Sequence, residues 1–245
     1  MTESLPRAAR IVEKTRENPR TVSLVLDRSL DARPGQFAML WLPGMDEKPF
    51  SIAAASPLMF TVSRVGPFSE ALQALAPGDL LWVRGPFGTG WSVDAASALL
   101  VGGGYGAAPL AFLAAALRGA GAHVEAALGA RTADDLLFAG RFAALGMPVH
   151  CATEDGSAGA RGKITDIVLP LVQSGRFGRL CACGPEGMLE NLDALCARAG
   201  LPAELSWEAY MRCGIGMCGS CEHGGRLVCM DGPVFRTGGE ARIAR

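Results

Sequence analysis

Residues 99–118 read LLVGGGYGAAPLAFLAAALR, and this stretch decides which fold the central part of the chain adopts. Residues 99–101 are an apolar strand, residues 102–106 are a glycine-rich turn, and residues 107–118 are an alanine-rich helix. This order is typical of a nucleotide-binding α/β unit, because bare backbone N–H groups at a helix N-terminus can bind a pyrophosphate. The turn lacks the full G-x-G-x-x-G pattern, so on its own it also fits a simple tight turn.

Strands and helices keep alternating after this unit, which predicts a doubly wound parallel sheet. The predicted strands cover residues 123–128, 147–153 and 179–183. The predicted helices cover residues 133–145, 163–173 and 185–199. Pro170 falls inside the second of these helices, and we expect it to end or kink that helix.

The first ninety residues show a different pattern, with short alternating strands separated by turns rich in proline and glycine. The strands are predicted at residues 21–26, 36–42, 49–54, 59–65 and 80–83. One helix is predicted at residues 69–76, with Ser69 as its N-cap. Many short strands at this spacing predict a small antiparallel β-barrel.

We therefore expect three domains: a β-barrel over residues 1–94, an α/β domain over residues 95–205, and a small domain over residues 206–245. The last segment is rich in glycine and cysteine and too short to build its own core. It needs a metal centre or a surface to pack against.

Charge and hydropathy exclude two classes of partner. The formal net charge is −1, and no basic block stands out that would neutralise a run of phosphates, so no nucleic acid is expected. The longest apolar stretch, residues 107–117, is too short to cross a membrane, so no membrane partner is expected. The N-terminus lacks the basic and then apolar order of a secretory signal, which predicts a cytoplasmic location.

Four of the eight cysteines lie close together near the C-terminus, at Cys213, Cys218, Cys221 and Cys229. Their spacing is C-x4-C-x2-C-x7-C, and the first three fit the plant-type [2Fe–2S] pattern. A structural zinc site is the alternative, but zinc ribbons usually show two C-x2-C pairs and only one is present. His223 follows closely, and we interpret it as a loop histidine because four thiolates complete the ligand set.

The remaining four cysteines fall in predicted strands or helices. Cys151, Cys181 and Cys196 are expected to be buried as small hydrophobic side chains. Cys183 is different, because it opens the run Cys-Gly-Pro-Glu-Gly-Met at the carboxyl end of a strand. Doubly wound sheets bind their ligands at such strand ends.

Together these motifs resemble the ferredoxin–NADP reductase superfamily, and most closely its iron–sulfur branch, the electron-transfer subunit of class B dihydroorotate dehydrogenase. The resemblance covers nearly the whole chain. It implies an antiparallel FAD-binding β-barrel, then a doubly wound NAD-binding α/β domain, then a small [2Fe–2S] cluster domain. Glu208, Met211 and the cysteine run follow the family's order, although the gap from Cys221 to Cys229 is shorter than the family's.

The resemblance also assigns cofactor-binding positions. The Arg-x-x-Ser flavin motif falls on residues 48–51, with lysine in place of arginine, and a second flavin segment falls on residues 62–69, with serine in place of threonine. The FAD positions are Lys48, Pro49, Phe50, Ser51, Val62, Ser63, Arg64, Gly66, Phe68 and Ser69. The NAD(H) positions are Gly102, Gly103, Gly104, Gly106, Pro109, Cys183, Gly184, Pro185 and Met188. The four clustered cysteines are the iron ligands.

The order of these modules implies an electron-transfer function. A nicotinamide exchanges two electrons as hydride, and an iron–sulfur cluster passes electrons singly. No acid–base pair or nucleophilic triad is evident, so no catalytic residue is assigned and a separate subunit is expected to act on substrate. In the resembled enzyme that partner carries FMN and oxidises dihydroorotate in pyrimidine biosynthesis, and the assembly is expected to be a heterotetramer.

Two alternatives stay open. The chain also fits an NAD(P)H-dependent electron-input subunit of another oxidoreductase, of the hydrogenase or ferredoxin reductase type. A zinc-bearing module without enzyme activity is the alternative from a different class. For docking to a partner, the candidate apolar residues are Ile215, Met217, Val234 and Phe235, which equally fit a role in wrapping the cluster.

Overall fold

The computed structural model describes residues 3–237, and these fold into two compact units. The barrel unit combines the residues up to Gly90 with residues 209–233. The sheet unit combines residues 91–208 with the segment that starts at Val234. Among the described residues, no helix is long and apolar enough to cross a membrane.

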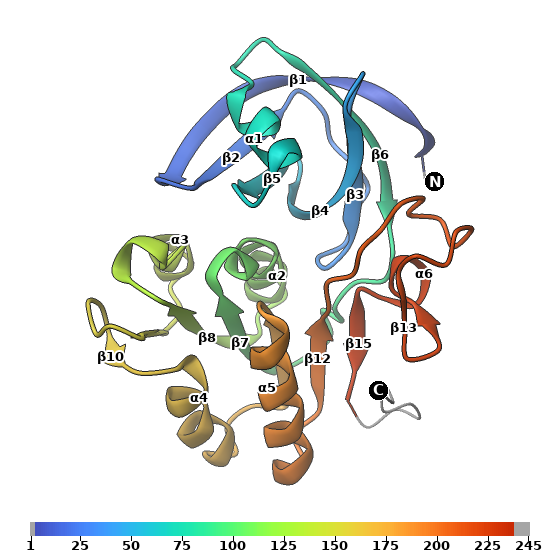
Figure 1. The fold of residues 1–245 in the computed structure, drawn as a ribbon. Helices are drawn as coiled ribbons and strands as arrows, with labels where there is room; N and C mark the ends of the chain where they lie inside the picture. Colours follow the sequence, from blue (N-terminus) through green and yellow to red (C-terminus); the bar gives the residue numbers. More distant parts are fainter. Residues whose placement is uncertain (1–2, 238–245) are drawn as a thin grey trace. The chain divides into compact units, whose positions relative to one another are not determined.

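The barrel unit is built on a closed antiparallel barrel with the strand order β1-β2-β5-β4-β3-β6 (Figure 1). Its elements are β1 (Glu3–Asn18), β2 (Thr21–Leu26), β3 (Phe37–Leu42), β4 (Asp46–Ala55), β5 (Leu58–Ser63), α1 (Pro67–Ala74) and β6 (Leu80–Phe87). Alternate side chains point into the barrel, and Leu24, Leu40 and Phe60 are completely buried there. The predicted antiparallel barrel is confirmed.

The long first strand was not predicted from the sequence. Polar residues dominate β1, and the inward positions Ala9 and Ile11 are buried between exposed neighbours. Two buried side chains among residues 5–18 make a weak apolar pattern. The strand is nevertheless essential for closure, because it pairs with β2 along one edge and with β6 along the other.

The sheet unit contains a seven-stranded sheet with the order β10-β9-β8-β7-β11-β12-β15. Its strands are β7 (Ser97–Gly103), β8 (His123–Ala130), β9 (Val149–Thr153), β10 (Ala160–Arg161), β11 (Arg179–Cys183), β12 (Ala203–Ser206) and β15 (Val234–Arg236). All neighbouring strands are parallel except β12 and β15. The chain runs outward from β7 through β8 and β9, then returns to place β11 on the other side of β7. This reversal of strand order confirms the predicted doubly wound sheet.

Helices flank this sheet (Figure 1). They are α2 (Ala107–Gly119), α3 (Ala139–Ala144), α4 (Ile164–Gln173) and α5 (Glu186–Ala199). The apolar faces of α4 and α5 pack on the sheet, and Val168 and Leu192 are completely buried against Leu99, Val101 and Leu180. This core holds rigid the strand ends that carry the predicted nucleotide turns.

Two local predictions are wrong, and a third fails in one of its two forms. The helix expected at 133–145 is a 3-10 turn (Ala133–Asp135) and the short α3, because Phe138 between them adopts a left-handed backbone with φ 65°. Pro170 does not end α4, which continues to Gln173, and a kink at this residue, the other expected outcome, stays a prediction. Cys151 is half-buried, because its strand β9 is covered on the outer edge only by the two-residue β10, whereas Cys181 and Cys196 are buried as predicted.

The C-terminal segment is shared between the two units. Residues 209–233 contain β13 (Glu222–His223), β14 (Arg226–Leu227) and α6 (Val228–Asp231), and they belong to the barrel unit. Val234 and Phe235 lie in β15 and are buried, so the prediction that they contribute to an exposed docking patch is wrong. The limits of the three predicted domains stay predictions.

Candidate functional site

The two turns predicted to bind NAD(H) are in contact with each other. Gly102 at the end of β7 is paired in register with Cys183 at the end of β11. A Cβ atom on Gly103 would lie 2.8 Å from Cδ of Pro185 and 2.9 Å from Sδ of Met188. A Cβ atom on Gly106 would overlap the Cys183 carbonyl group. The turns meet where the strand order reverses, which is the position at which such sheets bind ligands.

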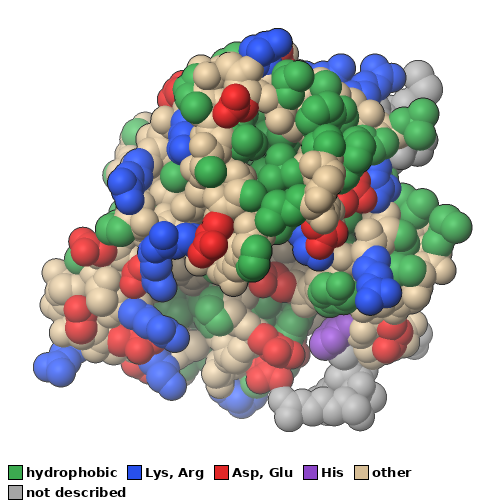
Figure 2. Space-filling view, turned by 45° about the horizontal axis from the view of Figure 1, so that its top comes forward, with side chains coloured by type: hydrophobic (Ala, Val, Ile, Leu, Met, Phe, Trp, Pro, Cys, Tyr) green, Lys and Arg blue, Asp and Glu red, His purple; other side chains and the backbone are tan. Residues whose placement is uncertain are grey.

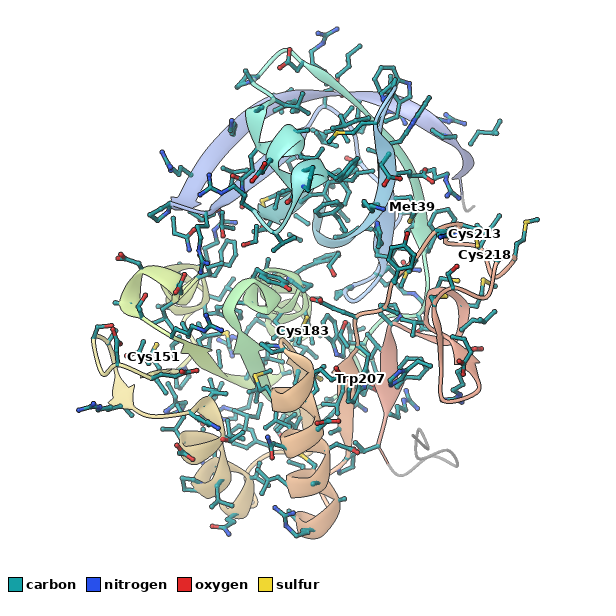
Figure 3. The ribbon with its side chains drawn as sticks, viewed as in Figure 1. Met39, Cys151, Cys183, Trp207, Cys213 and Cys218 are labelled. Atoms are coloured by element: carbon teal, nitrogen blue, oxygen red, sulfur yellow. The ribbon has the colours of Figure 1, made fainter. Side chains whose placement is uncertain are left out.

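Two titratable groups beside these turns, Cys183 and Tyr105, are uncharged near neutral pH. Burial, followed by the charge of Glu208, raises the pKa of Cys183 to about 12, although a hydrogen bond with Ser206 acts in the opposite direction. Burial also raises the pKa of Tyr105 to about 12, and its hydroxyl lies 3.4 Å from Oε2 of Glu208. Figure 3 shows Cys183 at the carboxyl end of its strand. Cys183 is therefore a neutral thiol that can line a binding site without adding charge.

The two predicted flavin segments are also brought together. Phe50 on β4 and Phe68 on α1 have ring centroids 6.2 Å apart. Lys48 also lies on β4. Its Nζ is 2.6 Å from Oδ2 of Asp46 and 5.4 Å from the centre of the Tyr210 ring. The hydrogen bond from Lys48 lowers the pKa of Asp46. Strand β4 thus carries both a ring of the aromatic pair and a cation, and a cation can bind a phosphate.

Ser69 organises the second flavin segment, but not as the N-cap that was predicted. Helix α1 begins two residues earlier, and the Ser69 hydroxyl accepts hydrogen bonds from the backbone N–H groups of Val65 (2.9 Å) and Gly66 (3.0 Å). This contact orders the turn between β5 and α1. Val62, another predicted position, is completely buried, so its side chain belongs to the barrel core.

The four clustered cysteines lie in one loop. Cys213 influences the pKa of Cys218, and Cys221 and Cys213 both raise that of Cys229, so the four side chains are near one another. Backbone N–H groups point at the sulfurs, with Gly216 N 3.2 Å from Sγ of Cys229. Ile215 N lies 3.5 Å from Sγ of Cys213, and Cys229 N lies 3.4 Å from Sγ of Cys221.

This donor set fits a [2Fe–2S] cluster, which takes four thiolates and accepts hydrogen bonds at its sulfurs. Among residues 3–237, no three histidine, cysteine or acidic side chains are placed around one point as a single metal ion requires. The exposed Cys218 has a pKa lowered to about 6 by hydrogen bonds with Ser220, whereas burial raises that of Cys229 to about 11.

The cysteine loop is held against the barrel by residues that the sequence did not single out. Nη2 of Arg84 on β6 donates a hydrogen bond of 2.7 Å to the Cys213 carbonyl oxygen. Gly214 has φ 69°, and a Cβ atom there would lie 3.0 Å from Cγ of Met39. Figure 3 shows Met39 close to Cys213. No local signal predicts these contacts, since Arg84 and Cys213 are 129 positions apart in the chain.

Comparisons with known proteins agree with this arrangement. Residues 208–239 match the family model described as the iron–sulfur cluster binding domain of dihydroorotate dehydrogenase B. A probable electron transfer subunit of dihydroorotate dehydrogenase B (NAD(+)) from Methanocaldococcus jannaschii is 40% identical over 94% of this chain and 89% of its own. A counterpart from Methanopyrus kandleri is 41% identical over 97% of this chain and 92% of its own.

Solved structures show the same fold. The structure of an NADH-dependent reduced ferredoxin-NADP oxidoreductase has a TM-score of 0.86 and 31% identity, and the match covers 96% of this chain and 90% of that one. An Amycolatopsis cytochrome P450 reductase has a TM-score of 0.68 and 28% identity, with 80% of this chain and 67% of that one covered.

Fold and site define an oxidoreductase subunit that transfers electrons with a flavin and an iron–sulfur cluster and is linked to NAD. More specifically, the chain belongs to the family of dihydroorotate dehydrogenase B (NAD(+)) electron transfer subunits. The predicted family, fold class, function and cofactors, namely FAD, a [2Fe–2S] cluster and NAD(H), are confirmed. The individual cofactor-binding residues and the four iron ligands stay predictions.

Proposed function

We propose that this chain is the NAD-linked half of a two-subunit dihydroorotate dehydrogenase, whose partner carries FMN and oxidises dihydroorotate. Electrons then run from the partner to the cysteine loop, on to the flavin site of the barrel, and finally to NAD⁺. The observation that carries the proposal is the packing of the cysteine loop on the same barrel that holds both flavin segments. Identities near 40% with subunits of this name support it.

The chain's own residues would orient and insulate these groups. When bound, FAD exchanges two electrons with a nicotinamide and single electrons with an iron–sulfur cluster. We infer that Phe50 and Ser51 face the flavin, that Lys48 neutralises its pyrophosphate, and that the bare turn around Gly103 admits the pyrophosphate of NAD(H). Cys183 stays protonated because its pKa is about 12, so it adds no negative charge beside a hydride acceptor.

The partner is expected to dock near the cysteine loop. Ile215, Met217, Met230 and Tyr210 on this segment are exposed, with Met217 82% accessible. Figure 2 shows that hydrophobic side chains reach the surface on the face drawn. Exposed apolar residues around a redox centre favour a protein partner. We further propose a heterotetramer of two such pairs.

We also propose a cytoplasmic location. Thiolates are the ligands that an iron–sulfur cluster needs, and a reducing compartment keeps cysteines in that form. All eight cysteines are unpaired by disulfides in this structure.

The test uses the full chain purified anaerobically, alone and with an FMN-bearing dihydroorotate dehydrogenase subunit. Alone, it should hold about two irons and two acid-labile sulfides, and NADH should reduce its flavin while dihydroorotate does not. Dihydroorotate oxidation by NAD⁺ should appear only with the partner. Cys218→Ser should lose iron, whereas Cys151→Ser, a cysteine outside the loop, should keep it. Stoichiometric zinc, or dihydroorotate oxidation by the chain alone, would contradict the proposal.

One observation favours a second function, electron input to another oxidoreductase. The NADH-dependent ferredoxin-NADP oxidoreductase structure matches nearly the whole chain at 31% identity. If this function were correct, the chain would co-purify from its host with a partner that lacks dihydroorotate activity. Identification of the co-purified partner therefore separates the two functions.

A further inference from the structure

Arg84 is a buried arginine that joins two parts of the barrel unit with different predicted roles. Its side chain is 10% exposed. Nε and Nη2 donate to Oε1 and Oε2 of Glu47 at 2.8 and 2.6 Å, which is the two-pronged geometry of a strong ion pair. Nη2 also donates to the Cys213 carbonyl oxygen at 2.7 Å. One guanidinium thus contacts both a barrel carboxylate and the first cysteine of the loop.

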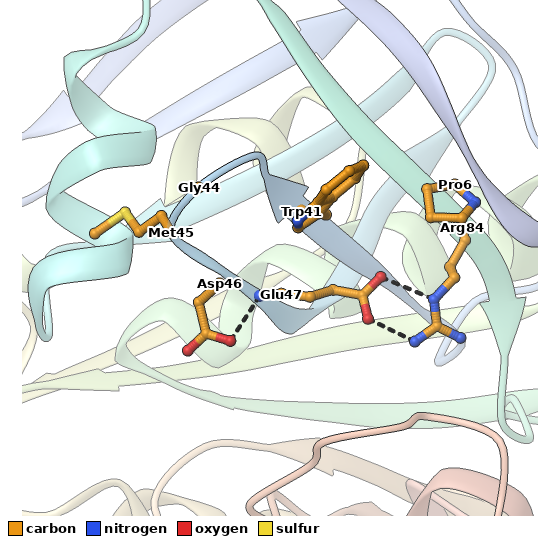
Figure 4. Close-up of a pocket in the computed structure, with 7 residues that line it drawn as sticks. All are labelled: Pro6, Trp41, Gly44, Met45, Asp46, Glu47 and Arg84. Carbon is orange, nitrogen blue, oxygen red and sulfur yellow. Dashed lines mark hydrogen bonds and ion pairs between the residues drawn. The ribbon is translucent and has the colours of Figure 1, made fainter.

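The position of Glu47 gives this pair a link to the flavin segment. Glu47 directly precedes Lys48 on β4, and it lies opposite Trp41 on β3. Arg84 lies opposite Met39 on β3 from the other side. The ion pair therefore crosses the outer surface of β3, as Figure 4 shows, and lies between the strand of the flavin motif and the cysteine loop.

We propose that Arg84 and Glu47 are positioning residues for the iron–sulfur cluster, and that their opposite charges set its reduction potential. The proposal rests on the assignment of Cys213 as an iron ligand in the proposed function. When the opposite charges of Arg84 and Glu47 are both present beside an iron ligand, their electric fields at the cluster largely cancel. Each one alone contributes a large field, because a buried charge is weakly screened.

The sign of each effect follows from the charge that reduction adds. The cluster gains one electron and hence one negative charge when it is reduced. Without Glu47, the positive charge of Arg84 is no longer neutralised and stabilises the reduced cluster, so the potential rises. Without Arg84, the negative charge of Glu47 destabilises the reduced cluster, so the potential falls. A double variant that lacks both charges should return toward the wild-type value.

The surroundings limit the size of these shifts. The pair forms one wall of an open cavity of about 480 Å³, which Pro6, Trp41 and Met45 also line (Figure 4). Glu47 is 21% exposed through this cavity, so solvent partly screens the pair. We expect each single variant to change the reduction equilibrium about tenfold, which for one electron is about 59 mV.

The experiment is a redox titration of the anaerobically purified full chain, followed by the electron paramagnetic resonance signal of the reduced cluster. The variants are Glu47→Gln, Arg84→Gln, the double variant and Arg84→Lys. The control is Arg10→Gln, because Arg10 also donates to a backbone carbonyl of the barrel unit, that of Gly78, and is exposed. We expect a higher potential for Glu47→Gln, a lower one for Arg84→Gln, and unchanged values for the control.

Arg84→Lys keeps the charge but loses the two-pronged contact, so it should leave the potential near that of the wild type while the loop binds its cluster less firmly. Shifts of the same sign in Glu47→Gln and Arg84→Gln would overturn the proposal, because they would indicate a purely structural role. Shifts in reduction potential no larger than that of the Arg10→Gln control would also overturn the proposal. If Arg84→Gln loses the cluster, Glu47→Gln and Arg84→Lys still decide the result. A wild-type chain without iron and sulfide would instead refute the cluster assignment itself.

Discussion

Replacement of Glu125 by glutamine should destabilise the sheet unit by removing a buried charge with three partners. Glu125 lies on β8 and is 2% exposed. Its Oε1 accepts hydrogen bonds from Nη1 of Arg176 at 2.7 Å and from Nε2 of His123 at 3.2 Å. Its Oε2 accepts one from Nε2 of His150 at 2.8 Å. The carboxylate therefore joins β8 to β9 and to the loop that leads into β11.

The size of the loss follows from these contacts. A hydrogen bond to a charged group contributes about 1.5–3 kcal/mol, but the three partner side chains are between 36% and 54% exposed and are partly screened by solvent. Glutamine also keeps part of the hydrogen bonding. We therefore expect a loss of about 2 kcal/mol in unfolding free energy, which lowers Tm by roughly 4–8 °C in a chain of this size.

The pH dependence adds a second measurement. Burial alone would raise the pKa of Glu125, but hydrogen bonds from His150 and His123 and the charge of Arg176 lower it overall from 4.5. A carboxyl group with a lowered pKa contributes its full stabilisation above its ordinary value and loses it as the pH falls through the folded value. The difference between the wild type and Glu125→Gln should therefore be present above about pH 4.5 and shrink as the pH falls further below that value.

The assay is thermal unfolding followed by circular dichroism above and below this pH. Glu154→Gln is the matched control, since Glu154 is an exposed glutamate in the same unit. We expect the control to unfold within 1 °C or so of the wild type, as surface substitutions usually do. A Glu125→Gln protein as stable as the control, or a difference that does not shrink as the pH falls below about 4.5, would refute the reasoning.

Three further predictions concern the nucleotide and flavin turns. Gly106→Ala should abolish NAD(H) binding measured by titration calorimetry, because a Cβ atom there overlaps Cys183, whereas Gly119→Ala, with nothing within 4 Å, should bind normally. Lys48→Ala should lower the flavin content after gel filtration and Lys48→Arg should preserve it, because only a cation binds phosphate strongly; equal flavin in all forms would contradict the assignment. Ser69→Ala should lower the unfolding free energy by about 1 kcal/mol in denaturant titrations, because its hydroxyl accepts two backbone hydrogen bonds, and no change would show that the turn before α1 does not need the hydroxyl.

The parts of the fold that could be predicted are those encoded by neighbouring residues. The glycine-rich turn after β7 requires bare backbone at Gly103 and Gly106, and the cysteine loop requires thiols at fixed spacing, so both leave a local pattern. The strand and helix alternation around β7 is likewise local. Each of these predictions needed only the chemistry of one short segment.

The parts that were missed depend on partners far away in the chain. β1 has few apolar residues and is defined by pairing with β2 and β6. β15 pairs with β12 across thirty residues, with Phe235 opposite Leu205, and no pattern within its three residues predicts this. The break before α3 arises from the backbone of Phe138, a residue that rarely adopts a positive φ.

Contacts with residues far away in the chain also explain how the short cysteine loop is stabilised. Residues 209–233 bury few side chains of their own, chiefly Met211, Cys221, Val228 and Cys229. Such a segment cannot supply a hydrophobic core. Instead, the guanidinium of Arg84 holds the Cys213 carbonyl group, and the side chain of Met39 packs against Gly214. The barrel thereby supplies part of the environment of the loop as well as the flavin segments. A change at Glu47 on β4 or Arg84 on β6 is then expected to alter the properties of the cluster even when all four cysteines are kept.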